Sequence, residues 1–357
     1  MKVLALAAYP EAGASSRFRV LQYAPLLAAR GVELEFSSFL STHDFAHFYD
    51  PQHRAAKARA ALSGIVRQTR RILERNDYDV LWVQREAMML GPAWSELFAT
   101  RALRKPMVFD FDDAIWLPNA GPQRHPVLAK LLRYPSKTSA LITHAAHVFA
   151  ATEYLADFAR AKSTRVSVIP TVVSRETWRP LPSIRKELVV GWVGTHSTAP
   201  FLELVRPALL ALWEKGLRFR IRIVGAGTPL SFGAIPVDNT AWTLAAELDN
   251  FHAIDIGLAP MPDTPWNQGK GGFKQLQYMA CGIPCVTSMW RGGTDFIRDE
   301  ANALVAHDTS GWVRALERVL TDSALRAKLA ECGRALVEEE YCAEQQSQRI
   351  AVTFNGL

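Results

Sequence analysis

Short apolar segments alternate along the chain with longer stretches in which apolar residues recur every three or four positions. The short segments are rich in Val, Leu, Ile and Phe, as in buried strands, and the longer stretches have the periodicity of amphipathic helices. Strands that alternate with helices predict a parallel, doubly wound α/β sheet. In the first half of the chain the predicted strands are 2–8, 32–39, 79–84, 106–113, 147–152 and 165–171, and the predicted helices are 15–31, about 51–76 and a stretch that ends at 104.

The pattern restarts after PLPSIRKE (180–187), a polar stretch with two prolines that is typical of a linker. We therefore predict two Rossmann-like domains that face a cleft, over residues 1–172 and 187–338. A C-terminal helix in 339–357 is expected to pack back towards the first domain. In the second half the predicted strands are 187–194, 219–227, 254–260, 283–288 and 302–306, with one helix that ends at Lys215 and a final helix over about 339–354.

The composition is that of an ordinary globular protein. The chain has 357 residues, of which 49% are hydrophobic and 21% charged, which is enough for two separate cores. No apolar run approaches the ~18 to 20 residues of a membrane span, and the short apolar run at the N-terminus fits a strand better than a signal peptide. The four cysteines lack metal-site spacing and are expected to be free thiols in a reducing cytosol.

Basic residues are concentrated in the first half. Residues 1–180 contain 24 Lys and Arg against 16 Asp and Glu, and 53–75 contains seven Lys and Arg against the single Glu74. This asymmetry predicts an anionic partner, but there is no nucleic-acid-binding motif, so we expect no nucleic acid. Two interpretations of 53–75 remain open, a solvated helix face and attachment to an anionic membrane surface.

The stretch NQGKGGFKQLQYMACGIPCVTS places two glycines and two lysines at the start of a predicted helix. Gly271 and Gly272 allow backbone N–H groups to approach an anion where the helix dipole favours negative charge. Lys270 and Lys274 can add charge-assisted bonds to phosphate. Gln277 can share a helix face with Lys274 and bond ribose hydroxyls. A plain turn with solvated lysines is the alternative.

This stretch resembles the donor-binding segment of family-4 retaining glycosyltransferases. That family has a Glu, a glycine-rich turn, a second Glu eight residues later and then A-M-A-C-G-x-P-V-V. MACGIPCV matches the tail, and Gly269 and Gln277 stand at the places of the two glutamates. The subgroup with G-K-x-x-F-K-x-x-Q-Y-M-A is the most similar. The resemblance spans nearly the whole chain, including GWVGTHSTAPFLELV in the second half and HVFAATEYLADFAR in the first.

The resemblance implies a GT-B fold and transfer of a sugar, with retention, from a nucleoside-diphosphate sugar to an acceptor hydroxyl. The C-terminal half would bind the donor and the N-terminal half a saccharide or lipid-linked acceptor, in surface-polysaccharide or glycolipid assembly. Lys270, Lys274 and the backbone N–H groups of Gly271, Gly272 and Phe273 would stabilise the leaving diphosphate. No metal and no cofactor beyond the donor substrate is expected, and the protein would be cytoplasmic or peripheral on the inner face of the membrane.

A second predicted donor loop follows the strand that begins the second half. Gly194 is followed by Thr195, Ser197 and Thr198, which can cap a helix whose N-terminus faces phosphate, and His196 lies in the same loop. Many members of the family have an Arg directly after this glycine and a Lys five residues later. Here Thr195 and Pro200 stand at those places, so we assign the cationic role to the lysines of the glycine-rich segment.

A glycine-containing loop also enters the first predicted helix, in PEAGASSRFRV. Gly13, Arg17 and Arg19 are predicted to lie on the acceptor or phosphate side of the cleft, because the corresponding loop of the family faces it. Arg17 could then reach the donor phosphates or an acidic acceptor. The alternative is that both arginines lie on a solvated first turn.

FDFDDAIW ends a predicted strand with three carboxylates, Asp110, Asp112 and Asp113. Charged residues at the carboxyl end of a parallel strand point into the ligand-binding crevice. The family often has a His-Asp pair here, so Asp112 or Asp113 is predicted to orient or deprotonate the acceptor hydroxyl, provided that burial raises its pKa. The alternative is a helix cap by Asp113 with a buried structural Asp110. A GT-A metal site or a haloacid-dehalogenase nucleophile is not expected, because the chain has two domains and lacks the following Gly-Thr.

Two further functions stay open because both family glutamates are absent. The chain could be a nucleotide-sugar-binding subunit without transfer activity, or a GT-B sugar-nucleotide epimerase.

Overall fold

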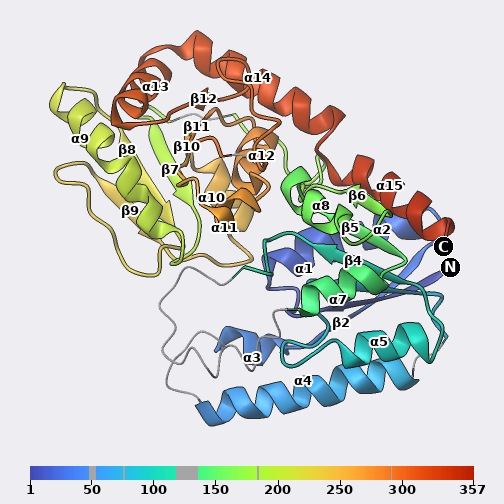
Figure 1. Ribbon diagram of the computed structural model, residues 1–357. Helices are drawn as coiled ribbons and strands as arrows, with labels where there is room; N and C mark the ends of the chain where they lie inside the picture. Colours follow the sequence, from blue (N-terminus) through green and yellow to red (C-terminus); the bar gives the residue numbers. More distant parts are fainter. Residues whose placement is uncertain (48–53, 75–76, 118–135, 183–184, 291) are drawn as a thin grey trace. The chain divides into compact units, whose positions relative to one another are not determined.

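The computed structural model describes residues 1–47, 54–74, 77–117, 136–182, 185–290 and 292–357 (Figure 1). The chain divides into two compact units. The N-terminal unit contains 1–171, 269–271 and 343–357, and the C-terminal unit contains 172–268 and 272–342. The first unit is therefore assembled from three separate segments of the chain.

The N-terminal unit is built on a six-stranded parallel sheet in the order β2-β1-β3-β4-β5-β6. The strands β3 and β4 are buried along their whole length, which explains their nearly continuous apolar sequence. Gln84 at the end of β3 is aligned with Asp110 of β4, so polar residues from two strands meet at one edge of the sheet. The strands are β1 (Lys2–Ala7), β2 (Glu33–Ser38), β3 (Val80–Gln84), β4 (Met107–Phe111), β5 (His147–Ala150) and β6 (Val166–Val168).

The predicted continuous helix over 15–31 is wrong. The structure has α1 (Ala14–Arg19), a 3-10 turn and α2 (Ala24–Ala28) in its place. Pro25 explains the break, because it has no N–H and its ring would clash with the carbonyl four residues earlier in a continuous helix. The other helices of this unit are α3 (Thr42–Ala46), α4 (Arg54–Glu74), α5 (Trp94–Arg101), α7 (Lys137–His144), α8 (Glu153–Arg160) and α15 (Ala343–Asn355).

Three polar residues attach the basic helix α4 to the sheet. Arg67 Nη1 donates to the Phe39 carbonyl oxygen at 2.8 Å, and Arg71 pairs with Glu35 of β2. Gln68 is fully buried and its Nε2 donates to backbone oxygens at the ends of β1 and β2. Part of the basic run is therefore partly buried and bonded to the sheet.

The C-terminal unit has a second six-stranded parallel sheet, in the order β12-β11-β10-β7-β8-β9. The sequence pattern missed one strand, β9, because VDNT is short and polar. The strands are β7 (Val189–Val193), β8 (Arg220–Val224), β9 (Val237–Thr240), β10 (Ile256–Ala259), β11 (Cys285–Thr287) and β12 (Leu304–Val305). The helices are α9 (Arg206–Glu214), α10 (Glu247–His252), α11 (Pro265–Gln268), α12 (Phe273–Ala280), α13 (Thr309–Thr321) and α14 (Ser323–Glu339).

Helix α12 is fixed in the middle of this unit. The Tyr278 hydroxyl accepts a hydrogen bond from the Val193 N–H at 3.2 Å and lies 3.3 Å from the Gly191 carbonyl oxygen, which ties α12 to β7. A side chain at Gly257 would lie 2.6 Å from the Tyr278 ring, so the strand below needs a glycine there. Arg334 of α14 donates to the last-turn Ala280 carbonyl oxygen at 2.6 Å. These contacts fix the position of α12, and with it the position of the glycine turn at its start.

Helix α15 completes the core of the N-terminal unit, where it packs against α2 (Figure 1). Phe354 is fully buried, and its ring meets that of Trp82 edge to face with centroids 5.4 Å apart. The last helix thus covers an aromatic side chain from the centre of the first sheet.

We expect Phe354→Ala to lower the free energy of unfolding by about 3 to 5 kcal/mol, because it removes a buried ring and leaves a cavity. Val352→Ala is the matched control, since Val352 is on the same helix and 67% exposed. Urea unfolding of both variants measures the difference. Equal stability of the two variants would show that the last turn of α15 adds nothing to the core.

Candidate active site

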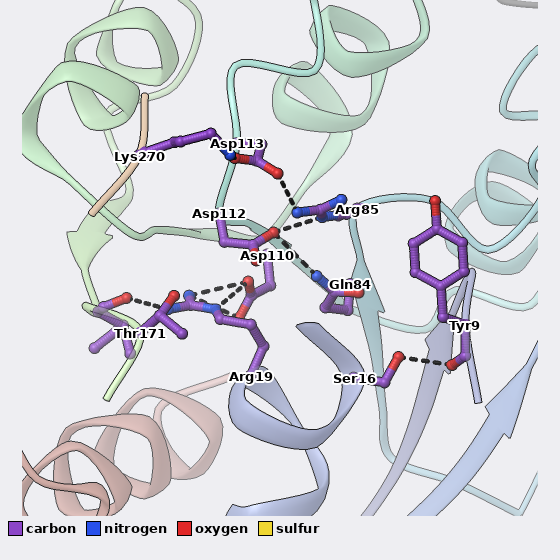
Figure 2. A network of polar contacts seen from close by, with 11 residues as sticks. Tyr9, Ser16, Arg19, Gln84, Arg85, Asp110, Asp112, Asp113, Thr171 and Lys270 are labelled. Carbon is purple, nitrogen blue, oxygen red and sulfur yellow. Dashed lines mark hydrogen bonds and ion pairs between the residues drawn. The ribbon is translucent and has the colours of Figure 1, made fainter. Parts of the chain in front are cut away.

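Polar side chains gather at the carboxyl edge of the first sheet (Figure 2). Arg85 directly follows β3, and Asp112 and Asp113 directly follow β4. Because β3 and β4 are adjacent and parallel, these three side chains meet. Arg19 of α1 and Lys270 approach the same network (Figure 2).

Arg19 and Asp110 form a fully buried ion pair. Arg19 Nε and Nη2 donate to the two carboxylate oxygens of Asp110 at 3.0 and 3.1 Å. Arg19 Nη1 also donates to the Ile169 carbonyl oxygen at 2.5 Å and to Thr171 Oγ1 at 3.3 Å. We expected Arg19 on the acceptor or phosphate side of the cleft. The structure places it in the interior, where its charge is taken up by Asp110.

Burial raises the pKa of Asp110 to about 6, and Arg19 acts in the opposite direction. The carboxylate is therefore ionised at neutral pH and takes up a proton as the pH falls below about 6. Asp110 is a structural group, as one of the alternatives from the sequence had it, because both of its oxygens are used by Arg19.

Arg85 links the other two carboxylates, and the sequence analysis did not single it out. Its Nε donates to Asp112 Oδ1 at 2.6 Å, and its Nη2 bonds Asp113 Oδ2. Its backbone has φ 60°, a left-handed conformation that is uncommon for a non-glycine residue, and its N–H donates to the Asp110 carbonyl oxygen at 2.6 Å. A charged residue directly after an apolar strand was the available signal.

The pKa of Asp113 is lowered and not raised. Burial alone would raise it, but the positive charges of Lys270 and then of Arg85 outweigh burial. The expected route to a general base, a pKa raised by burial, is therefore absent at Asp113. The ionised carboxylate is instead suited to accept hydrogen bonds and to hold cations.

The segment 269–271 belongs to the N-terminal unit. Lys270 Nζ lies 3.4 Å from Asp113 Oδ1. At Gly269 an added Cβ would lie 2.9 Å from the backbone nitrogen and the Cβ of Ala114, and at Gly271 it would lie 3.2 Å from Thr152 Cγ2. A glutamate at Gly269 would collide with Ala114, which gives a physical reason for the absence of the first family glutamate.

The first loop contains the two other predicted residues of this half. The Gly13 N–H donates to the Pro10 carbonyl oxygen at 2.9 Å, and a Cβ on Gly13 would lie 2.6 Å from that of Tyr9, so this turn requires glycine. The Arg17 guanidinium stacks 4.8 Å above the Phe18 ring. Neither residue belongs to the carboxylate network in Figure 2.

In the C-terminal unit, Gly272 precedes α12 with φ 61°. A Cβ there would lie 2.7 Å from the Phe296 ring, so both backbone and space require glycine. Phe273 is the first residue of the helix, and Gly272 at the N-cap provides no side-chain hydrogen bond to the backbone N–H groups there.

Lys274 and Gln277 form a pair on α12. Lys274 Nζ donates to Gln277 Oε1 at 2.8 Å and lies 5.3 Å from the centroid of the Phe251 ring. Gln277 is fully buried, and its Nε2 has no hydrogen-bond partner among the residues that the structure describes. The structure thus brings these two predicted donor residues together and leaves a buried donor group available.

The loop after β7 contains the remaining predicted donor residues. A Cβ on Gly194 would lie 2.2 Å from the Trp192 ring, and the hydroxyl groups of Thr195 and Ser197 lie 2.8 Å apart. His196 is exposed and lies close to Gly227. The helix that we expected to start here is a 3-10 helix (199–204) followed by α9, and Thr198 makes no side-chain cap bond. Pro200 and Pro207 fall in the first turns of these two helices.

Within the described ranges, no group of three or more His, Cys, Asp and Glu side chains is arranged to hold a metal ion.

Comparisons of sequence identify a related domain. Residues 206–351 match the family described as "Glycosyl transferase-like". A D-inositol 3-phosphate glycosyltransferase from Stackebrandtia nassauensis is 29% identical over 228 residues, which are 55% of this chain and 49% of the relative. One from Salinispora arenicola is 37% identical over 65 residues, 18% of this chain and 14% of the relative. The chain matches about half the length of the first relative and less of the second.

Comparisons of structure cover the whole chain. Sucrose-phosphate synthase from Thermosynechococcus elongatus superimposes with a TM-score of 0.71 at 15% identity, over 100% of this chain and 99% of the other. Anabaena HepE in complex with UDP-glucose gives 0.69 at 15% identity, over 100% of both chains. These likenesses confirm the predicted GT-B fold with its two Rossmann-like domains. Residues 206–351 thus form a glycosyltransferase-like domain within a chain of GT-B fold.

We expect Arg19→Met to lower the free energy of unfolding by about 3 to 5 kcal/mol at pH 8, because it leaves Asp110 buried without its partner. The loss should be smaller at pH 5. The raised pKa means that Asp110 is neutral in the folded protein below about pH 6. Its negative charge, which Arg19 neutralises, appears only as the pH rises through that value, so the loss of Arg19 costs more stability at pH 8 than at pH 5. Urea unfolding at both pH values measures this, with Arg17→Met as the matched control. A loss independent of pH would contradict the assignment.

Proposed function

We propose that the protein is a glycosyltransferase that moves a sugar from a nucleoside-diphosphate sugar to an acceptor hydroxyl. The observation that carries the proposal is the Lys274–Gln277 pair on α12, behind the glycine turn. The buried Gln277 Nε2 is a hydrogen-bond donor that needs an acceptor, and Lys274 supplies a positive charge beside it. A ribose oxygen and a phosphate oxygen of one nucleotide meet both needs.

The proposed chemistry depends on charge stabilisation. Lys274 and the backbone N–H groups at the start of α12 would neutralise the diphosphate as the bond to the sugar breaks. This needs no metal or further cofactor. The roles of Lys270 and of the loop with Thr195, His196 and Ser197 on the donor stay predictions. Retention of configuration, as in family 4, is also part of the proposal and is supported by the MACGIPCV motif.

The donor is supported by a structural neighbour, since HepE binds UDP-glucose. We propose that the acceptor is a saccharide or a lipid-linked saccharide in surface-polysaccharide or glycolipid assembly. A glycosyltransferase-like subunit without transfer activity is the second candidate. It is favoured by Gly269, which leaves no room for the acidic residue that touches the donor sugar in family 4. A transferase releases nucleoside diphosphate in the presence of acceptor, an epimerase changes the sugar without release, and a binding subunit does neither.

We expect one nucleoside diphosphate from a panel of UDP, GDP, ADP and CDP to stabilise the protein against thermal unfolding. At a hundredfold excess over the dissociation constant the gain is ~2.7 kcal/mol. Lys274→Ala should lose this gain, while Lys215→Ala should keep it, since Lys215 is an exposed lysine paired with Glu317 in the same unit. If no nucleotide raises the unfolding temperature, the proposed donor site is wrong.

We further propose that the protein attaches to an anionic membrane surface through α4 and α5. Arg67 and Arg71 point to the sheet, so the basic run alone does not carry this proposal. The exposed face of α4 instead mixes basic and apolar residues at helical spacing. Its members are Arg59, Leu62, Val66, Arg70 and Leu73.

Helix α5 lies beside α4 (Figure 1). Trp94 is 77% exposed and Phe98 46% exposed, one turn apart. An apolar surface with aromatic residues and a basic surround matches the interfacial region of an anionic bilayer. No helix in the described part of the chain has the length and apolar character needed to cross a membrane.

We expect the wild-type protein to float with vesicles that contain anionic lipid, and the double variant Trp94→Ser/Phe98→Ser to stay in the soluble fraction. The matched control is Leu204→Ser/Leu244→Ser, which removes two exposed leucines from the C-terminal unit. Absence of vesicle binding by the wild-type protein, or a double variant that floats as well, would contradict the proposal. A concentration-dependent rise in mass that the double variant abolishes would identify a second copy of the chain as the partner.

A further inference from the structure

The two adjacent carboxylates after β4 are bonded differently. Asp113 uses both oxygens, with Oδ2 bonded to Arg85 and Oδ1 3.4 Å from Lys270 Nζ. Asp112 uses only one, because Arg85 Nε at 2.6 Å and Gln84 Nε2 at 3.3 Å both donate to Oδ1. No described residue donates a hydrogen bond to Asp112 Oδ2 (Figure 2).

This difference is imposed by two residues at the end of β3. Gln84 is fully buried and directs its Nε2 at Asp112, although its Oε1 finds no partner in the described part of the chain. Arg85 adopts φ 60°, a strained conformation for a non-glycine residue that persists where the surroundings determine it. Its guanidinium is only 20% exposed and spans both carboxylates. Strain and burial together hold Asp112 in one orientation.

We propose that Arg85 is the positioning residue that presents Asp112 Oδ2 to the acceptor hydroxyl. Asp113 is used to hold Lys270 and does not contact the acceptor. The inference rests on the proposed transfer reaction, and it assigns different roles to two residues that the sequence treated as equivalent. Arg85 itself touches no reacting atom.

The chemical consequence is that Asp112 aligns the hydroxyl by accepting its hydrogen bond. Fixing a reacting group in this way is worth a large factor in rate, since a displacement of about 1 Å can cost ~100-fold. The charged groups that act on Asp112 or Asp113 are Arg85, Lys270, Asp110 and Arg19, and Tyr9 acts on Arg85. Of these, Arg85 is the one that bonds both carboxylates.

The first experiment does not need activity. The side-chain carboxyl signals of ¹³C-labelled aspartate are followed by NMR against pH in the wild-type protein, Arg85→Gln and Arg85→Lys. Asp113→Asn assigns the signal of Asp113. We expect Asp113 to titrate at higher pH in Arg85→Gln, because a cation that lowers its pKa is lost, and to return towards the wild-type value in Arg85→Lys. An unchanged titration in Arg85→Gln would overturn the positioning role.

The second experiment measures nucleotide release from the sugar nucleotide whose diphosphate stabilises the protein, with and without a panel of saccharide acceptors. We expect Arg85→Gln and Asp112→Asn to lower acceptor-dependent release about 100-fold. Binding of the nucleoside diphosphate by both variants should equal that of the wild type, and Arg85→Lys should recover part of the rate. Asp113→Asn should lose less than Asp112→Asn.

The outcomes separate this inference from the proposed function. A wild-type protein that binds no nucleoside diphosphate contradicts the proposed function and the acceptor role with it. Normal nucleotide binding and turnover in Arg85→Gln contradicts only the positioning role. A greater loss in Asp113→Asn than in Asp112→Asn would reverse the assignment of the two carboxylates.

Discussion

The buried ion pair between Arg19 and Asp110 is the interaction on which the candidate site of the N-terminal unit depends. It joins α1, the end of β4 and the segment after β6 in one network of hydrogen bonds. A buried pair is costly to desolvate and is stable only when its remaining donors are satisfied, as the Ile169 carbonyl oxygen and the Thr171 hydroxyl do here. With Asp110 fixed, the two carboxylates that follow it leave the sheet at a defined point.

The register of the first sheet then brings the cations to these carboxylates. Gln84 lies opposite Asp110, so the next residue, Arg85, meets the chain just beyond β4. The backbone bond from Arg85 to Asp110 closes this arrangement. Charge balance follows, with two arginines and Lys270 set against three aspartates. The ionic network at this edge of the sheet therefore lies largely on the short segments that directly follow β3 and β4, together with Lys270.

Sequence reasoning captured the fold and half of this site. The strands were predictable because a buried parallel strand is nearly continuous in apolar residues, and the carboxylates because they follow such a strand. The same rule applied to DVLWVQRE would have selected Arg85. The burial of Arg19 could not be predicted from the sequence, since its partner Asp110 lies 91 residues away along the chain. The break at Pro25 was readable, whereas β9 was not, because its residues are polar and its pairing comes only from the neighbouring strand.

The position of α15 has a consequence for how the protein is made. In the sequence, residues of the C-terminal unit come between the segments that form the N-terminal unit. Phe354 can pack on Trp82 only after the last helix has been synthesised. Domains generally fold as units during synthesis. The first sheet is synthesised before its covering helix, so Trp82 lacks its contact with Phe354 until the C-terminal unit and α15 have also been synthesised. The N-terminal unit is thus the first to begin synthesis and the last to be completed.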